Sequence, residues 1–181
     1  MEDKEHCCED HLEERMATVK SPYCYVGSGL PNVFLTGVKY YVCTVCGTQS
    51  AEIPALKQLL AEIARTVVQE AFPLTGSQVR FLRKRLNRKA KEFAQMISLS
   101  PERFSAIETS DDEHMDPARD KLVRVIYRVL SGDRKLKTGM EKEQQFEQWI
   151  TSIQGRGTGE RIVATWLRNH HWRVEAEPIA A

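Results

Sequence analysis

The spacing of hydrophobic residues changes from strand-like to helix-like near residue 53. Between residues 15 and 46, apolar runs broken by glycine and proline predict short strands. The β-forming residues there are Val33, Phe34, Val38, Tyr40, Tyr41 and Val42. From residue 53 onward, apolar positions recur three and four residues apart, which predicts an amphipathic helix ending near Phe72 and Pro73. Its apolar positions are Ile53, Leu56, Leu59, Leu60, Ile63 and Val67, and we expect them to form core or a dimer seam.

Four short helical patterns follow Pro73. Thr75 and Gln78 have the spacing of a capping box, which predicts a helix beginning after Thr75. A second helix is expected from about Lys89 to Ile97. Ser100-Pro101 and Asp116-Pro117 each place a capping side chain before a proline, as at the first turn of a helix. Helices this short are marginal alone, so we expect them to pack against one another.

The pattern weakens after Leu130. Helical spacing recurs twice, first at Phe146, Trp149, Ile150 and Ile153, then at Ile162, Val163, Trp166 and Leu167. The glycine-rich stretch 155–159 between them is expected to be a flexible joint, and residues after His171 a tail. These patterns predict helices in the last fifty residues.

Together these elements predict an α+β fold. We expect a small zinc-bound, β-rich N-terminal domain over residues 1–52 and a connecting helix over 53–73. An all-α helix-turn-helix domain is expected over 74–131, and a helical C-terminal extension with a tail over 132–181.

Composition changes the picture through the distribution of charge. The 181 residues carry a formal net charge of only +1, but residues 75–105 contain eight Lys/Arg and two acids, a local charge of +6. Residues 108–116 contain five acids and no Lys or Arg, a local charge of −5. Local charge sets the field that a partner meets, so the basic segment favours an anionic partner.

Cysteine spacing predicts a structural metal site. Cys43 and Cys46 are two residues apart and are followed by a glycine, the form of a zinc knuckle. Cys8 and His11 have the same gap upstream, so Cys8, His11, Cys43 and Cys46 are the candidate ligands of Zn²⁺, with Cys7 or His6 as alternatives in the first pair. Four protein ligands leave no open position, so the site would be structural. Cys24 is expected to be a small buried apolar residue.

The helices around Ser98 predict a DNA-binding helix-turn-helix. Phe104 and Ile107 would face the core, which turns the rest of the third helix outward, and in such units that helix enters the major groove. The alternative is an ordinary α-hairpin with a solvated charged face. The candidate DNA-binding residues are Lys89, Ala90, Lys91, Ser100, Pro101, Glu102, Arg103 and Ser105, and Arg83, Lys84 and Arg88 add positive charge beside them.

Two groups of segments resemble the MqsA-type antitoxins and transcriptional regulators. Residues 74–84, 91–96, 99–105 and 116–122 are similar to their Xre/Cro-family helix-turn-helix. Residues 28–38 and 43–47 are similar to their YgiT-type zinc finger. The resemblance covers roughly Cys8 to Leu130.

This resemblance implies a bacterial, cytoplasmic homodimer that binds an operator in double-stranded DNA and often represses its own operon. By analogy, the N-terminal domain would bind a protein partner such as a toxin. The chain departs from the family at His11, Ala90, Ala106 and the acidic residues 111–113. These departures bear on sequence readout more than on fold.

The sequence thus predicts a sequence-specific, DNA-binding transcriptional regulator with a structural zinc site, acting as a repressor or antitoxin of a toxin-antitoxin-like operon. We do not expect it to be an enzyme. The alternative is a protein-binding antitoxin or adaptor that keeps the fold and has lost specific DNA readout. No apolar run approaches the roughly 20 residues of a membrane span, and the acidic first sixteen residues do not resemble a targeting peptide. We therefore expect no membrane partner and a cytoplasmic location, which the odd number of five cysteines also favours.

Overall fold

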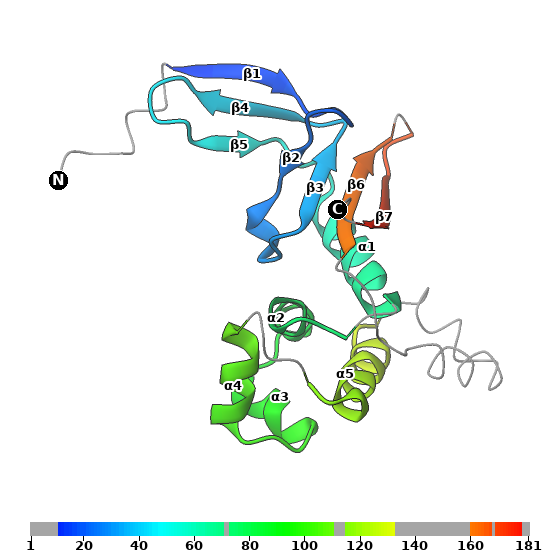
Figure 1. Ribbon diagram of the computed structural model, residues 1–181. Coiled ribbons are helices and arrows are strands. Elements are labelled where there is room, and N and C mark those ends of the chain that lie inside the picture. The colour runs from blue at the N-terminus through cyan, green and yellow to red at the C-terminus, as the bar shows by residue number, and fades with distance from the viewer. Residues whose placement is uncertain (1–10, 71–72, 111–114, 133–159, 168, 179–181) are drawn as a thin grey trace.

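The computed structural model describes residues 11–70, 73–110, 115–132, 160–167 and 169–178 (Figure 1). Two small sheets lie at one end of the molecule and a group of short helices at the other, with α1 (Leu56–Gln69) between them. Within these ranges, no helix combines the length and apolar character needed to cross a bilayer.

The first sheet is antiparallel and comes entirely from the N-terminal part. It consists of β1 (Leu12–Met16), β4 (Lys39–Cys43) and β5 (Gln49–Ala51), in the order β1-β4-β5. Leu12 pairs with Cys43, and all five residues of β1 are exposed. The strands predicted between residues 15 and 46 are therefore present, and this sheet has β1 and β5 as its edges.

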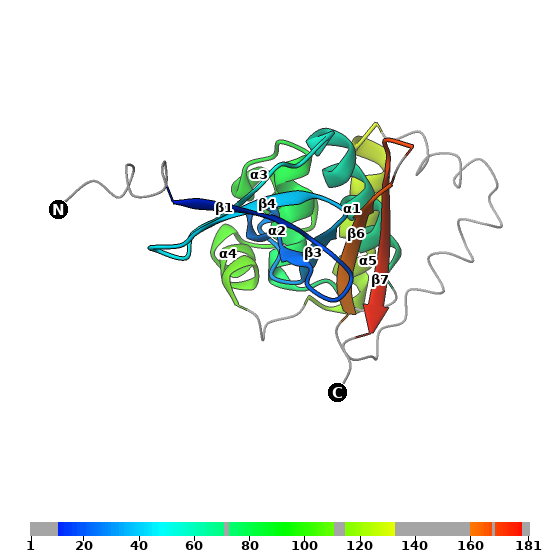
Figure 2. The same cartoon turned by 90° about the horizontal axis from the view of Figure 1, so that it is seen from above.

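The second sheet joins the two ends of the chain. Its order is β2-β3-β6-β7, formed by β2 (Tyr23–Cys24), β3 (Val33–Thr36), β6 (Glu160–Trp166) and β7 (Trp172–Pro178). The short 3-10 turn η1 (Val26–Ser28) links β2 to β3. β3 pairs with β6 in parallel, and the Thr36 hydroxyl bonds to that of Thr165 at 2.9 Å. Seen from above, β6 and β7 run side by side over the α1 side of the molecule (Figure 2).

The predicted helical C-terminal extension is therefore wrong. Residues 162–167, expected to form a helix, lie mostly in β6, and the expected tail after His171 is strand β7. Pairing with β3 outweighs the helical spacing, because Ile162 and Ala164 become fully buried between β3 and α1. The other two expectations, the helical spacing at 146–153 and the joint at 155–159, fall outside the described residues.

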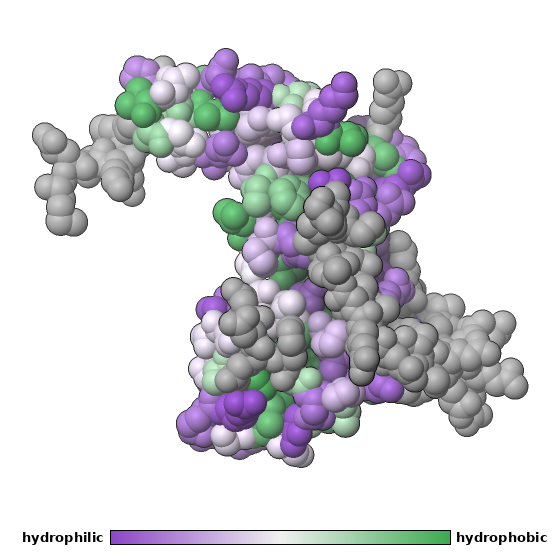
Figure 3. Space-filling model, viewed as in Figure 1, coloured by the Kyte–Doolittle hydropathy of each residue, from purple (hydrophilic) through white to green (hydrophobic). Residues whose placement is uncertain are grey.

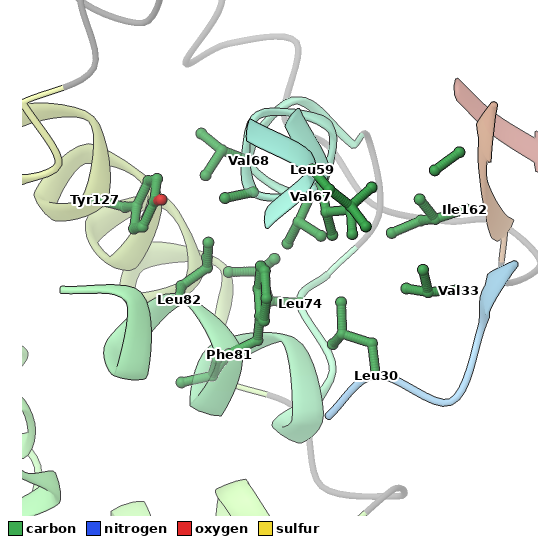
Figure 4. Close-up of a cluster of buried hydrophobic side chains, with 14 of the residues drawn as sticks. Leu30, Val33, Leu59, Val67, Val68, Leu74, Phe81, Leu82, Tyr127 and Ile162 are labelled. Atoms are coloured by element: carbon green, nitrogen blue, oxygen red, sulfur yellow. The ribbon is translucent and has the colours of Figure 1, made fainter. Parts of the chain in front are cut away.

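The connecting helix is confirmed, and it joins the sheets to the helices through one core. α1 buries Leu59, Ile63 and Val67 completely. Figure 4 shows that side chains from β3, β6, α1, α2 and α5 meet around it. The two ends of the molecule therefore share a continuous hydrophobic interior.

The four short helices follow their predicted start signals. They are α2 (Gly76–Arg85), α3 (Ala90–Met96), α4 (Pro101–Thr109) and α5 (Pro117–Leu130). Thr75 and Gln78 form the predicted capping box, and the Ser100 and Asp116 side chains accept hydrogen bonds from the backbone N–H groups of Arg103 and Arg119. These bonds satisfy donors that the first turn of a helix leaves unpaired.

A buried ion pair fixes the helices on α1. Arg124 is completely buried and its Nε donates to the Asp120 carboxylate at 2.8 Å. Its Nη1 also donates to the carbonyls of Val67, Val68 and Glu70 at the end of α1. The other oxygen of Asp120 accepts from the N–H of Leu74 at 2.6 Å. This network caps α1 and sets the path of the chain into α2.

Candidate nucleic-acid interface

α3 and α4 form a compact helix-turn-helix around Ser98. The buried rings of Phe93 and Phe104 lie with centroids 5.7 Å apart and hold the two helices together. Ser98 adopts a left-handed conformation with φ of 55°, and the N–H of Leu99 donates to the carbonyl of Ala94. The turn predicted at Ser98-Leu99 is present, with Phe104 and Ile107 inside as expected.

The candidate DNA-binding residues are mostly exposed at the start of α3 and α4. Exposed residues are Lys89, Lys91, Ser100, Glu102, Arg103 and Ser105, whereas Ala90 and Pro101 are half-buried. Their surface lies at the end of the molecule farthest from the sheets, much of which is hydrophilic (Figure 3). The outer side of α4 is thus accessible, and Lys89 and Lys91 lie at the start of the adjoining helix α3.

α4 is positioned against α2 by a close approach and a buried ion pair. A Cβ placed on Gly76 would lie 1.9 Å from the Ile107 carbonyl oxygen, so only glycine fits there. Arg83 donates two hydrogen bonds to Glu108, at 2.7 and 2.8 Å, and a third to the carbonyl of Arg88. Arg83 had been expected to add positive charge beside the interface. Its guanidinium is instead held by a carboxylate inside the bundle.

The turn itself is held by Arg119 from α5. Its Nε donates to the carbonyl of Ile97 at 3.2 Å and its Nη2 to that of Ser98 at 3.4 Å. The same guanidinium pairs with Asp116, which caps α5. This pairing lowers the pKa of the Asp116 carboxyl below its ordinary value, since Arg119 donates hydrogen bonds to the charged form.

Glu102 places a negative charge in the first turn of α4. Hydrogen bonds from its own backbone N–H and from the Ser100 side chain lower the pKa of its carboxyl. It is therefore ionised at neutral pH. A carboxylate there repels phosphate, but it is also a group that accepts a hydrogen bond from cytosine N4. The acidic stretch 111–114, which could bear on the same approach, lies outside the described residues.

The zinc site expected within the N-terminal fold is not seen among the described residues. In these ranges, no group of three or more His, Cys, Asp or Glu side chains is close enough to hold a metal ion. Cys43 is buried and Cys46 exposed, with the Cys46 thiol 3.1 Å from the Thr48 hydroxyl. Cys8, Cys7 and His6 lie outside the described part. The fold class therefore needs correction in its zinc-bound domain as well as in its C-terminal helices.

The Cys43–Cys46 turn nevertheless has features that suit a half-site. The N–H of Gly47 donates to the carbonyl of Cys43 at 2.9 Å, and Gly47 has a φ of 73° that favours glycine. The N–H of Thr44 donates to the His11 carbonyl at 2.9 Å, so the backbone of His11 lies beside this turn. Cys24, expected to be buried, is exposed, because it faces outward from the two-residue strand β2.

Sequence reasoning missed two residues that position the helix-turn-helix. They are Gly76 and Arg119, and neither is among the residues singled out from the sequence. A guanidinium three residues after a capping aspartate signals a local pair, but nothing in the sequence indicates its bonds to the turn twenty residues earlier. Searches of family models, curated proteins and solved structures find no match to this chain.

Proposed function

We propose that this protein is a sequence-specific, double-stranded-DNA-binding transcriptional regulator of the repressor or antitoxin kind. The observation that carries the proposal is the α3–α4 helix-turn-helix, whose second helix keeps Glu102, Arg103 and Ser105 on an exposed side. In such units the second helix enters the major groove and its first residues meet base edges.

The charges around α4 suit this docking. Lys89 and Lys91 are exposed at the beginning of α3, where lysines meet the phosphates flanking a groove. None of the ion pairs found in the described ranges involves either lysine. Both side chains are therefore available to replace the counterions of DNA, and affinity should fall steeply as salt rises.

The test is a titration of the full chain with a labelled duplex from upstream of its own reading frame, read by fluorescence anisotropy. The double charge reversal Lys89→Glu/Lys91→Glu should weaken binding roughly 100-fold at moderate salt, because two phosphate contacts become repulsions. The matched control Lys20→Glu/Lys57→Glu reverses two exposed lysines elsewhere and should bind as the wild type does. Equal loss in both double variants, or in neither, would contradict the proposed docking.

A second candidate function is a protein-binding antitoxin or adaptor without specific DNA readout. Two observations favour it: the ionised carboxylate of Glu102 in the first turn of α4, and the half-buried Ala90 at the start of α3, which offers no polar arm. Strand β1 in the N-terminal domain is a fully exposed sheet edge, and a strand of a protein partner can pair with it. This function predicts a co-purifying protein and equal affinity for the upstream duplex and a scrambled duplex.

A further inference from the structure

A cleft between the sheets and α2 has charged lining residues that neither the core nor the helix-turn-helix uses. It measures about 410 Å³, within the usual size range of small-molecule sites. Its walls are the glycine-rich turn η1 on one side and α2 on the other, and its lining consists of Gly27, Ser28, Gly29, Leu60, Arg80, Phe81, Lys84 and Arg85.

The cleft is strongly cationic. Arg80, Lys84 and Arg85 line it, and no carboxylate does. The ion pairs and side-chain hydrogen bonds found in the described ranges involve none of these three side chains. Arg80 and Lys84 are one turn apart on α2 and Arg85 follows Lys84 directly, so three cations lie close together and repel one another unless an anion joins them.

The remaining walls suit a small ligand. Gly29 has a φ of 79°, a conformation that favours glycine, and a Cβ built there meets nothing within 4 Å. The turn therefore leaves open space beside Gly29. Leu60 and the largely buried Phe81 add apolar surface next to the cations. A ligand that fits these walls has anionic groups at one end and an apolar body at the other, as a nucleotide does.

The cleft is on a different side of α2 from the proposed DNA interface. Figure 1 places α2 between the blue turn that joins β2 to β3 and the pair α3 and α4. Arg83, which is held by Glu108 of α4, points to the helical bundle. Arg80 and Lys84, one turn apart, line the cleft instead.

We propose that this cleft binds a small phosphorylated ligand of the nucleotide class, with Arg80, Lys84 and Arg85 holding its phosphates. Arginine and lysine at such spacing bind phosphate by charge-assisted hydrogen bonds. The ligand would bridge the η1 turn and α2, which makes it an effector site separate from the DNA-binding surface. The inference does not depend on the proposed function.

The test is isothermal titration calorimetry of the full chain with ADP and with inorganic pyrophosphate. We expect ADP to bind the wild type, and pyrophosphate to bind more weakly because it lacks the apolar part. Arg80→Gln/Lys84→Gln should weaken ADP binding at least about tenfold, since two charge-assisted bonds are lost. The single variant Arg85→Gln provides a second measurement. Lys89→Gln/Lys91→Gln is the matched control and should bind ADP as the wild type does.

Three results would overturn the proposal. The first is no heat of binding from either probe up to millimolar concentration. The second is equal weakening in the cleft and control variants, which indicates general attraction of anions. The third is loss of duplex binding by Arg80→Gln/Lys84→Gln to the same extent as by the control, which assigns the cations to DNA. Since duplex and ADP binding are read separately, failure here leaves the proposed function standing.

Discussion

Arg119 shows how a single side chain outside the helix-turn-helix controls its shape. Its guanidinium lies on the carbonyls of Ile97 and Ser98, where the chain reverses between α3 and α4. Asp116 accepts from the same guanidinium and holds its orientation. The placement of α4 therefore depends on an ion pair in α5, and protonation of Asp116 in acid should weaken that pair.

The Asp116→Asn variant should lose more stability at neutral pH than in acid. The pKa of Asp116 is lowered in the folded protein, chiefly by its hydrogen bonds with Arg119. The ion pair therefore contributes fully to the free energy of unfolding above the pKa of aspartate in the unfolded chain, about 3.9. This contribution is lost progressively as the pH falls below that pKa. Asparagine keeps the helix cap, so the variant isolates the ion pair. Urea unfolding at pH 7 and pH 3 checks this, and a difference from the wild type that does not shrink in acid would refute it.

The zinc prediction also depends on individual residues, Cys43 and Cys46. If they form half of a structural site, purified protein should contain about one zinc per chain, as a closed four-ligand site requires. Cys43→Ser/Cys46→Ser should lose it, as measured by mass spectrometry of the metal. Cys24→Ser is the matched control, because Cys24 is exposed on another strand. The absence of zinc from the wild type, or an unchanged zinc content in the double variant, would refute the predicted site.

Among elements, the hairpin β6–β7 departs most from the expectation. Ile162, Val163 and Trp166 fit helical spacing equally well, and their partner strand β3 lies about 130 positions earlier in the sequence. The clearer signal was in β7, where Trp172, Val174 and Ala176 alternate with charged residues in a period of two. Reading that alternation would have predicted a strand where a tail was expected.

Trp172→Ala should destabilise the whole protein, although the residue is close to the C-terminus. Trp172 is 3% exposed, and its indole N–H donates to the Pro54 carbonyl at 2.8 Å. Truncation of a buried tryptophan costs about 3–5 kcal/mol. Arg173→Ala, on the exposed side of β7, should change stability by less than about 0.5 kcal/mol. Chemical denaturation measures both, and similar midpoints would show that the hairpin does not contribute to the core.

Over the whole molecule, one core links the sheets to the helix-turn-helix, but one apolar side of α5 is partly exposed within the described part of the chain. Leu122, Val129 and Leu130 are 38%, 47% and 42% exposed, and they share one side of the helix with the half-buried Ile126. The buried positions are instead Val123, Arg124 and Tyr127. An apolar strip of this kind is suited to a second copy of the chain, as a regulator of a palindromic operator needs.

If α5 forms the seam of a homodimer, Leu122→Glu/Val129→Glu should convert a dimer to a monomer. Two carboxylates in an apolar interface lose their hydration without gaining a partner, which is costly. Sedimentation velocity of wild type and variant at tens of micromolar checks the mass. Val19→Glu, at the most exposed of the large apolar residues described, is the control. A wild-type monomer, or a dimer in all three proteins, argues against this seam.

The sequence by itself determined the elements whose signals are local. Helix caps at Thr75, Ser100 and Asp116, and the apolar spacing of α1, act within one or two turns, so neighbouring residues suffice to predict them. Only the tertiary structure decided the pairing of β3 with β6 and the contacts of Gly76, Arg119 and Arg124. Each of these contacts joins residues that are close in space but far apart along the chain. Composition and the spacing of apolar residues do not reveal which distant residues will meet.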